Sequence, residues 1–301
     1  MEVKRNEQKS ENNSVKASSL LRDAWKSLKK NKLALLGMGI VVLFILVAIF
    51  APYITPYDPV KQLIWTEGAS AKLAPPSRDH IMGTDLYGRD IYTRVVYGAR
   101  ISLQISIAAM SLSVFIGIIM GTLAGYYGGV VDDIISWLIN VLYAFPFLLF
   151  IIAIVAFFPP SLILTFSAIS LVYWMSIARV VRGQVLSIKE KEYIESARAL
   201  GVSDIKIMFK HILPNVIAPV IVQGTLGLGT IILIEASLTY LGFGTQPPTP
   251  SWGYMISAGQ GYLKNGQWWW GVFPGIAIIL TVLGFNLFGD GLRDALDPKN
   301  K

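Results

Sequence analysis

Long runs without a charged residue dominate this chain and predict its architecture. A helix that crosses the roughly 30 Å hydrocarbon layer of a bilayer needs about 20 residues, with about 17 to 25 the usual range. Six runs reach that length, and they lack the polar face at helical period that helices of a water-soluble core show. The runs cover residues 33–51, 101–126, 134–158, 161–178, 212–234 and 265–289. The sequence therefore predicts an all-α fold, a polytopic membrane protein with six transmembrane helices.

Proline, tryptophan and glycine residues add detail to these spans. Pro146 lies in the third run and Pro219 in the fifth, and each is expected to kink or break its helix. Tryptophans occupy positions 268–270 at the start of the sixth run, where an aromatic belt at the membrane surface is expected. Gly117 and Gly121 suit close packing of the second run against another helix, and their spacing alone is little evidence of a dimer face.

Composition narrows the function classes. The 301 residues are 53% hydrophobic and 15% charged, whereas a soluble domain carries roughly 25% charged residues. The chain has no cysteine, which excludes disulfides, thiolate catalysis and cysteine zinc sites. Its two histidines, His80 and His211, are too far apart in sequence to suggest a histidine-rich metal site. With no catalytic dyad at membrane depth, we predict neither an enzyme nor a metal-binding protein.

The net charge of +7 is distributed as an orientation signal. Nine Lys/Arg and four acidic residues give residues 1–32 a net charge of +5, and seven against four give residues 179–211 a net charge of +3. Because basic segments remain in the cytoplasm, both segments are predicted to be cytoplasmic. Six spans then return the C-terminus to the cytoplasm. The basic excess therefore indicates topology in the cell membrane and contact with lipid, with no nucleic-acid partner.

The same reasoning divides the chain into segments. Residues 19–32 show an amphipathic pattern typical of an interfacial helix, after a polar stretch that we expect to be disordered. The predicted segments are a cytoplasmic tail with this helix (1–32), the first transmembrane helix (33–51), an extracytoplasmic segment (52–100), a permeation core of five helices (101–290) and a cytoplasmic tail (291–301).

The connection between the fourth and fifth runs, residues 183–215, is long and has its own predicted structure. Residues 192–200 are good helix formers, and Gly201 suits the position just after a helix end. Ser203 can cap a second helix, and Pro214 is placed where the chain turns into the fifth run. One face of that second helix is apolar, formed by Ile205, Met208, Phe209 and Ile212. This unit suits transmission of position to a partner protein.

The residues of this connection resemble a known motif. Glu195-Ser196-Ala197, three residues, Gly201, nine residues and then His211-Ile212-Leu213-Pro214 resemble the EAA loop of ABC importer permeases. Ser196 and His211 depart from the family pattern. Three further stretches resemble the oligopeptide/dipeptide/nickel subfamily, in particular the "C" member of its permease pair. They are residues 83–90 with 98–100, residues 144–146 and residues 247–253. The resemblance covers about residues 20–298.

This resemblance implies the type I ABC importer permease fold and a transport function. The chain would pair with a sister permease as a heterodimer and form a path for peptides delivered by an extracytoplasmic solute-binding protein. Two ABC ATPase subunits would bind ATP and Mg²⁺, since this chain has no phosphate-binding loop of its own. The residues implied in ATPase coupling are Glu192, Tyr193, Glu195, Ser196, Ala197, Arg198, Leu200, Gly201 and Pro214. A nickel or metal-complex importer is the alternative, and an ion-gradient-driven secondary transporter fits the single intramembrane acid poorly.

Charged residues near or within the spans are further candidates. Glu235 is the one carboxylate near the centre of a span, where it could line the translocation path, pair with the sister permease or make a hydrogen bond within the bundle. Arg179 and Arg182 follow the fourth run and are interpreted as interfacial anchors.

An external motif bracketed by glycines holds three more charged candidates, Asp85, Arg89 and Asp90. They could contact the solute-binding protein. Capping of a helix that precedes the second span and folding onto the membrane surface are the alternative roles.

Overall fold

The computed structural model describes residues 25–296. Residues 25–30 are helical, and a series of further helices follows them. The long elements are α2 (Lys32–Ile54), α4 (Ile91–Tyr127), α5 (Gly129–Tyr143), α6 (Phe147–Ala156), α7 (Leu162–Lys189), α10 (Leu213–Tyr240) and α12 (Trp269–Leu296). The short elements are α3 (Ile64–Glu67), η1 (Ala69–Ala71), α8 (Glu192–Ala199), α9 (Asp204–Ile207), η2 (Met208–Ile212), α11 (Trp252–Gly259) and η3 (Gln260–Asn265). No β-strand forms within this part of the chain, so the all-α prediction is confirmed.

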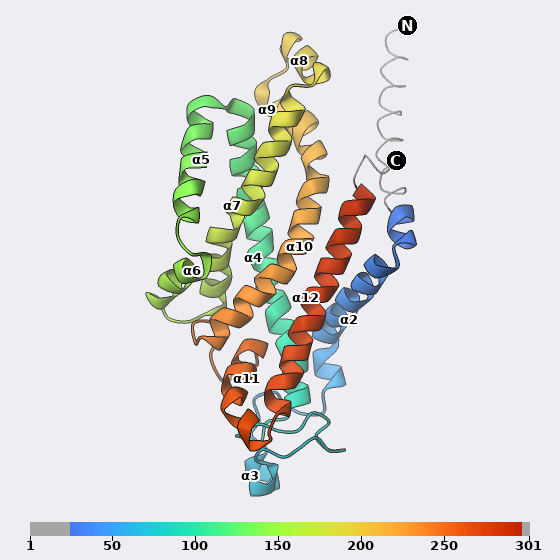
Figure 1. Cartoon of the computed structure of the whole chain (residues 1–301), viewed down its shortest axis with the longest axis vertical. Coiled ribbons are helices and arrows are strands. Elements are labelled where there is room, and N and C mark those ends of the chain that lie inside the picture. The colour runs from blue at the N-terminus through green and yellow to red at the C-terminus, as the bar shows by residue number, and fades with distance from the viewer. Residues whose placement is uncertain (1–24, 297–301) are drawn as a thin grey trace.

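The long helices run side by side, with α8 at one end of the molecule and α3 at the other (Figure 1). These are called the α8 end and the α3 end below. Within residues 25–296, five helices are long and apolar enough to cross a membrane, and a sixth span exists if the bent pair α5–α6 counts as one. The amphipathic helix predicted at 19–32 falls partly outside the described residues, as do the polar residues before it and the end of the predicted C-terminal tail.

The third predicted span is broken rather than straight. Its two halves, α5 and α6, meet at 86° across a break that contains Pro146, and α6 lies across the long axis of the molecule (Figure 1). Proline has no N–H to donate and disfavours the helical conformation at the preceding residue, so α5 ends before it and α6 begins after it. The expected break at Pro146 is confirmed, whereas Pro219 lies inside a continuous α10.

Two helix starts differ from those the charge-free runs indicate. Helix α4 begins ten residues before Ile101, because Asp90 caps it by accepting the N–H of Thr93 at 2.8 Å. The second amphipathic helix predicted after Ser203 is not separate, since residues Asp204–Tyr240 form one 37-residue helix. The expected turn at Pro214 is therefore wrong. A π-helical turn, η2, precedes this proline and absorbs the irregularity within the helix.

Glycines of α4 allow its close packing on α7. Gly117, Gly121 and Gly125 recur every four residues along one face of α4. A Cβ atom placed on them would lie within 2.6–2.7 Å of the Cβ atoms of three α7 residues, Ile177, Val181 and Val185. Small residues on one helix allow such close approach of membrane helices, where the hydrophobic effect does not drive association. The predicted close packing is confirmed, and it serves an interface within the chain rather than a dimer face.

The tryptophans at the start of α12 differ from the predicted aromatic belt. Trp268 is half exposed, but Trp269 and Trp270 are 7% and 2% exposed and pack into the core beside α2, α4 and α11. The Trp269 indole donates to the carbonyl of Thr84 at 3.2 Å, and the Trp252 indole of α11 donates to that of Val95 at 2.9 Å. The first bond attaches the segment before α4 to the start of α12, and the second attaches α11 to α4.

Candidate functional site

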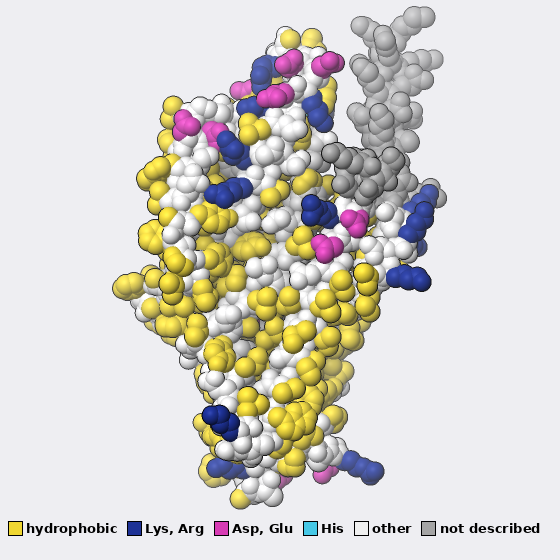
Figure 2. Space-filling model, viewed as in Figure 1, with side chains coloured by type: hydrophobic (Ala, Val, Ile, Leu, Met, Phe, Trp, Pro, Cys, Tyr) yellow, Lys and Arg dark blue, Asp and Glu magenta, His cyan; other side chains and the backbone are white. Residues whose placement is uncertain are grey.

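Helix α8 projects from one end of the molecule, and its residues divide into an anchor and an exposed face (Figure 1). Ile194 is fully buried and packs into the same core cluster as α4 and α7. Most of the predicted coupling residues face outward: Glu192, Tyr193, Glu195, Ser196 and Arg198 are exposed, and Ala197 is half-buried. Acidic and basic side chains gather at this tip (Figure 2). The arrangement is a charged helical knob on a rigid base.

Gly201 ends the knob in a left-handed turn. Its φ of +75° is a conformation that residues with a Cβ rarely adopt. The N–H of Gly201 donates to the carbonyl of Arg198 at 3.0 Å, and that of Val202 donates to Ala197 at 3.1 Å. This pair of bonds is the Schellman motif expected at such a helix end. It leaves the side chain of Leu200 83% exposed at the tip. Pro214 lies apart from the knob, in the first turn of α10.

A tyrosine at the end of α4 binds the segments on both sides of this turn. The hydroxyl of Tyr126 donates to Asp204 at 2.6 Å, and the guanidinium of Arg198 lies 5.7 Å from its ring centroid. Asp204 begins α9 and Arg198 lies in α8, so one side chain joins three helices. Sequence reasoning missed Tyr126, because a tyrosine that closes an apolar run is ordinarily an interfacial residue.

Replacing Tyr126 with phenylalanine is expected to loosen the knob. The variant removes a hydrogen bond to a carboxylate, which contributes about 1.5–3 kcal/mol, and leaves the aromatic packing. Amide hydrogen exchange of residues 192–202 should accelerate roughly tenfold or more, since the bond restrains the turn. Tyr127→Phe is the matched control, because Tyr127 is half exposed and its ring only contacts Tyr126. Equal exchange in both variants would contradict this role.

Two arginines of α7 make contacts with α5. Arg182 forms a bidentate pair with Asp132, with Nε and one terminal nitrogen each 2.6 Å from a carboxylate oxygen. Arg179 donates to the amide oxygen of Asn140 at 2.9 Å, and its guanidinium lies 4.2 Å from the ring centroid of Tyr143. Both arginines therefore connect α7 with α5, and their role as interfacial anchors stays a prediction.

The external motif is folded inward at the α3 end. Asp85, Arg89 and Asp90 are 0%, 4% and 2% exposed. Asp85 forms an ion pair with Arg89 at 2.7 Å. Asp90 caps α4, and its other carboxyl oxygen lies 3.1 Å from Nδ1 of His80. The capping alternative is thus realised by Asp90, and these three side chains are enclosed by their own loop. Arg94, which sequence reasoning missed, is buried beside them and donates to the carbonyl of Pro59 at 2.7 Å.

Glu235 lies between α4 and α10 with no exposed surface. The hydroxyl of Ser102 donates to one carboxyl oxygen at 2.9 Å, and that of Thr239 donates to the other at 3.0 Å. Of the three roles considered for this residue, the structure shows the hydrogen bond within the bundle. In this conformation the side chain faces neither an open path nor the outer surface of the subunit.

Glu235→Gln is expected to lower the free energy of unfolding by about 1 kcal/mol, since the amide nitrogen that replaces one carboxyl oxygen cannot accept the hydroxyl donated at that position. Thermal unfolding in detergent measures this loss. Ser102→Ala serves as the paired variant: if the two side chains form one network, the double variant should lose less stability than the sum of the single variants. Strict additivity would show that they act independently.

Comparison with known proteins shows the family of this chain. Residues 113–301, more than half of the chain, match the family described as "Binding-protein-dependent transport system inner membrane component". The chain belongs to this family. Residues 19–76 additionally match the "N-terminal TM domain of oligopeptide transport permease C". Members of this family are multi-pass inner-membrane permease components, in agreement with the apolar helices long enough to cross a membrane. Helix α8 lies within the matched region.

Two relatives illustrate the extent of the similarity. The "Dipeptide transport system permease protein DppC" of Alkalihalophilus pseudofirmus is 48% identical over 95% of this chain and 92% of its own. The "Oligopeptide transport system permease protein OppC" of Bacillus subtilis is 43% identical over 95% of this chain and 92% of its own. The resemblance to the "C" permeases of peptide importers is confirmed over nearly the whole length of the chain.

Solved structures support the fold. The permease of the MetNI methionine ABC transporter, in inward-facing conformations, superimposes with a TM-score of 0.55 and 20% identity over 67% of this chain and 96% of its own. A chain of an amino acid ABC transporter with histidines gives a TM-score of 0.51 and 17% identity over 67% and 94%. The predicted type I ABC importer permease fold is therefore confirmed.

Proposed function

We propose that this chain is the permease subunit of an ATP-driven importer that carries peptides. In this proposal it forms the translocation path with a sister permease as a heterodimer, and an extracytoplasmic solute-binding protein delivers the peptide. The observation that carries the proposal is helix α8 with its C-cap: a charged knob with a buried Ile194 anchor and an exposed Leu200, inside a chain similar to peptide permeases. The names of these relatives favour peptides over the nickel or metal-complex alternative.

In this proposal, ATP binding and hydrolysis by the ATPase subunits act on the chain through α8. Its exposed face docks on an ABC ATPase subunit, and the two ATPase subunits bind ATP and Mg²⁺. Closure of the ATPases displaces α8, and the bundle alternates between conformations open to either side. The shift requires that ATP binding favours one of these conformations. The contacts of Tyr126 with Asp204 and Arg198 support transmission, since they join α8 to α4 and to the start of α9.

The orientation follows from the position of the knob and from the charge. The α8 end faces the cytoplasm of a cell membrane, together with both termini. The net charge of +3 in residues 179–211 supports this, and the start of α2 and the end of α12 lie on the same side of the bundle (Figure 1). The loop at the α3 end then faces the solute-binding protein. Asp85, Arg89 and Asp90 support the shape of that loop, and the half-exposed Tyr87 beside them is available for contact.

Reconstitution tests the proposal. The chain is co-expressed with its sister permease, ATPases and binding protein, purified through a tag on this chain and placed in liposomes. The ATPases should co-purify, and a labelled dipeptide should accumulate only with ATP and the binding protein. Uptake driven by a proton gradient in the chain alone would contradict the proposal, and uptake of a nickel complex but no peptide would favour the alternative substrate.

A further inference from the structure

A row of polar side chains crosses three helices on one face of the bundle. It comprises Asn140 and Tyr143 of α5, Ser176 and Arg179 of α7 and Gln223 of α10, all exposed or half-buried. The amide of Gln223 donates to the hydroxyl of Ser176 at 3.2 Å, and Ser176 lies one turn from Arg179. This row is called the polar face below. Figure 2 shows basic side chains interrupting the hydrophobic surface over α5 and α7.

Much of the exposed surface of α2 and α12 is apolar, as expected for surfaces in contact with lipid. On α2 and α12 the exposed large side chains include Leu43, Leu46, Ile49, Ile279 and Leu283. The polar face departs from this pattern at the end of the span nearer α8. Arg179 directly follows the charge-free run 161–178, while Asn140, Tyr143, Ser176 and Gln223 lie within such runs. A guanidinium at a span end reaches water or a polar ligand, so the polar face adjoins one of these.

Arg179 is the one cation of the polar face, and it has no acidic partner within residues 25–296. Arg182, one turn away, is neutralised by Asp132 at 2.6 Å. Arg179 has no ion-pair partner anywhere in residues 25–296. Its one hydrogen bond there goes to the neutral amide of Asn140. An exposed arginine of a spanning helix without a carboxylate of its own is suited to receive one from outside the chain.

The neighbours of Arg179 hold its guanidinium in place. Asn140 accepts from one terminal nitrogen, and the ring of Tyr143 lies 4.2 Å away, at the distance of a cation–π contact. A guanidinium has five N–H donors in a planar fork that matches a carboxylate in bidentate geometry. One donor is used by Asn140, so the others remain for a ligand.

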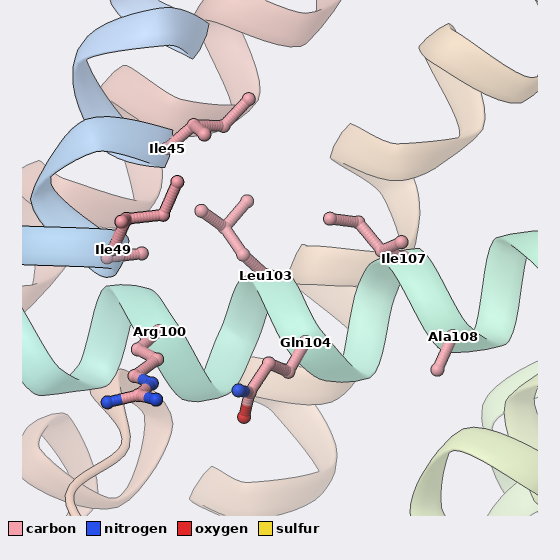
Figure 3. A pocket seen from close by; sticks show the side chains of 8 residues that line it. Ile45, Ile49, Arg100, Leu103, Gln104, Ile107 and Ala108 are labelled. Carbon is pink, nitrogen blue, oxygen red and sulfur yellow. The ribbon is translucent and has the colours of Figure 1, made fainter.

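A groove elsewhere on the described part of the chain has different chemistry. It lies between α2 and α4, has a volume of about 550 Å³ and is lined mainly by Ile45, Ile49, Leu103 and Ile107. The two polar side chains at its edge, Arg100 and Gln104, point to the opposite side of α4 from these apolar groups (Figure 3). The lining of this groove is mostly apolar, whereas the polar face offers hydrogen-bonding groups from three helices.

We infer that Arg179 is a binding site for the carboxylate group of the peptide that crosses the membrane. Asn140 and Tyr143 orient its guanidinium, and Ser176 and Gln223 continue the polar face beside it. The inference rests on the proposed function, and it adds a ligand group and a location to it. Each unmodified peptide carries an α-carboxylate, so one arginine serves peptides of differing side chains.

Charge-specific rescue tests this inference, and the absence of cysteine from the chain makes it practicable. Arg179→Cys is expected to lower dipeptide uptake by the complete importer about tenfold or more, the effect of losing a hydrogen-bonded charge. Reaction with aminoethyl methanethiosulfonate, which restores a positive charge, should recover uptake at least partly. Sulfonatoethyl methanethiosulfonate, which adds a negative charge, should not. Wild-type importer treated with both reagents controls for cysteines of the partners.

Matched variants keep the test decisive. Arg100→Cys also removes an exposed arginine from a spanning helix, and it should leave uptake within about twofold of wild type. Ser176→Cys retains Arg179 and should react with both reagents from water. Normal uptake by Arg179→Cys, equal rescue by both charges, or an unreactive Ser176→Cys would overturn the inference. Failure of the wild-type importer to take up any peptide would instead reject the proposed function, and the labelling of Ser176→Cys would still report whether the polar face adjoins water.

Discussion

An importer that carries Glu195→Arg in this subunit is expected to lose co-purification of its ATPase and nearly all ATP-dependent uptake. Glu195 lies in the first turn of α8 with its side chain exposed. Within the described residues it forms no ion pair, so the subunit itself gains or loses little from the change. A reversed charge in a docked interface leaves its partner group unpaired, which costs about 2–5 kcal/mol. That corresponds to a loss of affinity of roughly 30-fold or more.

The measurement is the ratio of ATPase to permease after purification through this chain, together with uptake in liposomes. Asp133→Arg is the matched control. Asp133 is an exposed acid near the start of α5, at the same end of the molecule, and its replacement changes the charge equally. Both ratio and uptake should stay near wild type in this control. Retention of the ATPase by Glu195→Arg would remove α8 as the docking element.

Gly121→Val is expected to prevent stable packing of α4 on α7. A Cβ at this position would lie 2.5 Å from the carbonyl oxygen of Ala178 and 2.7 Å from the Cβ of Val181. A backbone carbonyl cannot rotate away as a flexible side chain does, so the two helices must separate. Overpacking of this kind costs about 3 kcal/mol or more, which is a large part of the stability of a typical domain. We expect the unfolding midpoint in detergent to fall by roughly 10 °C.

Gly183→Ala separates this effect from the loss of a glycine as such. Gly183 also lies in α7, but a Cβ there would meet no atom within 4 Å. Its replacement should be neutral or slightly stabilising, because alanine is the better helix former. A Gly121→Val variant as stable as Gly183→Ala would mean that α4 and α7 tolerate a wider separation than the structure indicates.

The spans and the knob were predictable because each depends on local sequence. The length of a charge-free run identifies a helix that can cross a bilayer. The glycine at position 201 identifies the end of the separate helix α8. The break at Pro146 was also expected, since proline acts on its immediate neighbours. Its bend of 86° was not, because the direction that α6 takes depends on packing against α7.

The contacts that define the polar face and the external loop were not predictable. Arg179 meets Asn140 and Tyr143 only because α5 runs back beside α7, and residues 39 and 36 positions apart carry no local signal of that meeting. The same is true of Asp90, whose neighbour His80 reaches it through the fold of the loop. Charged residues at span ends have two common roles, anchoring and pairing, and only tertiary structure distinguishes them.

The helices of this bundle also differ in stiffness. Helices α2, α10 and α12 each contain an internal proline, whereas α4 and α7 contain none and are joined along their glycine face. With 37 residues, α4 is a rod of about 55 Å. One end holds Tyr126 against Asp204, and the other is capped by Asp90 in the external loop. A tilt of roughly 10° imposed at the first end moves the second by about 10 Å, from the length of the rod alone. The α4–α7 pair can therefore move as one rigid body. In the proposed importer, displacement of its α8 end by the ATPase would move the loop around Asp90 directly, without a series of side-chain rearrangements between the two ends.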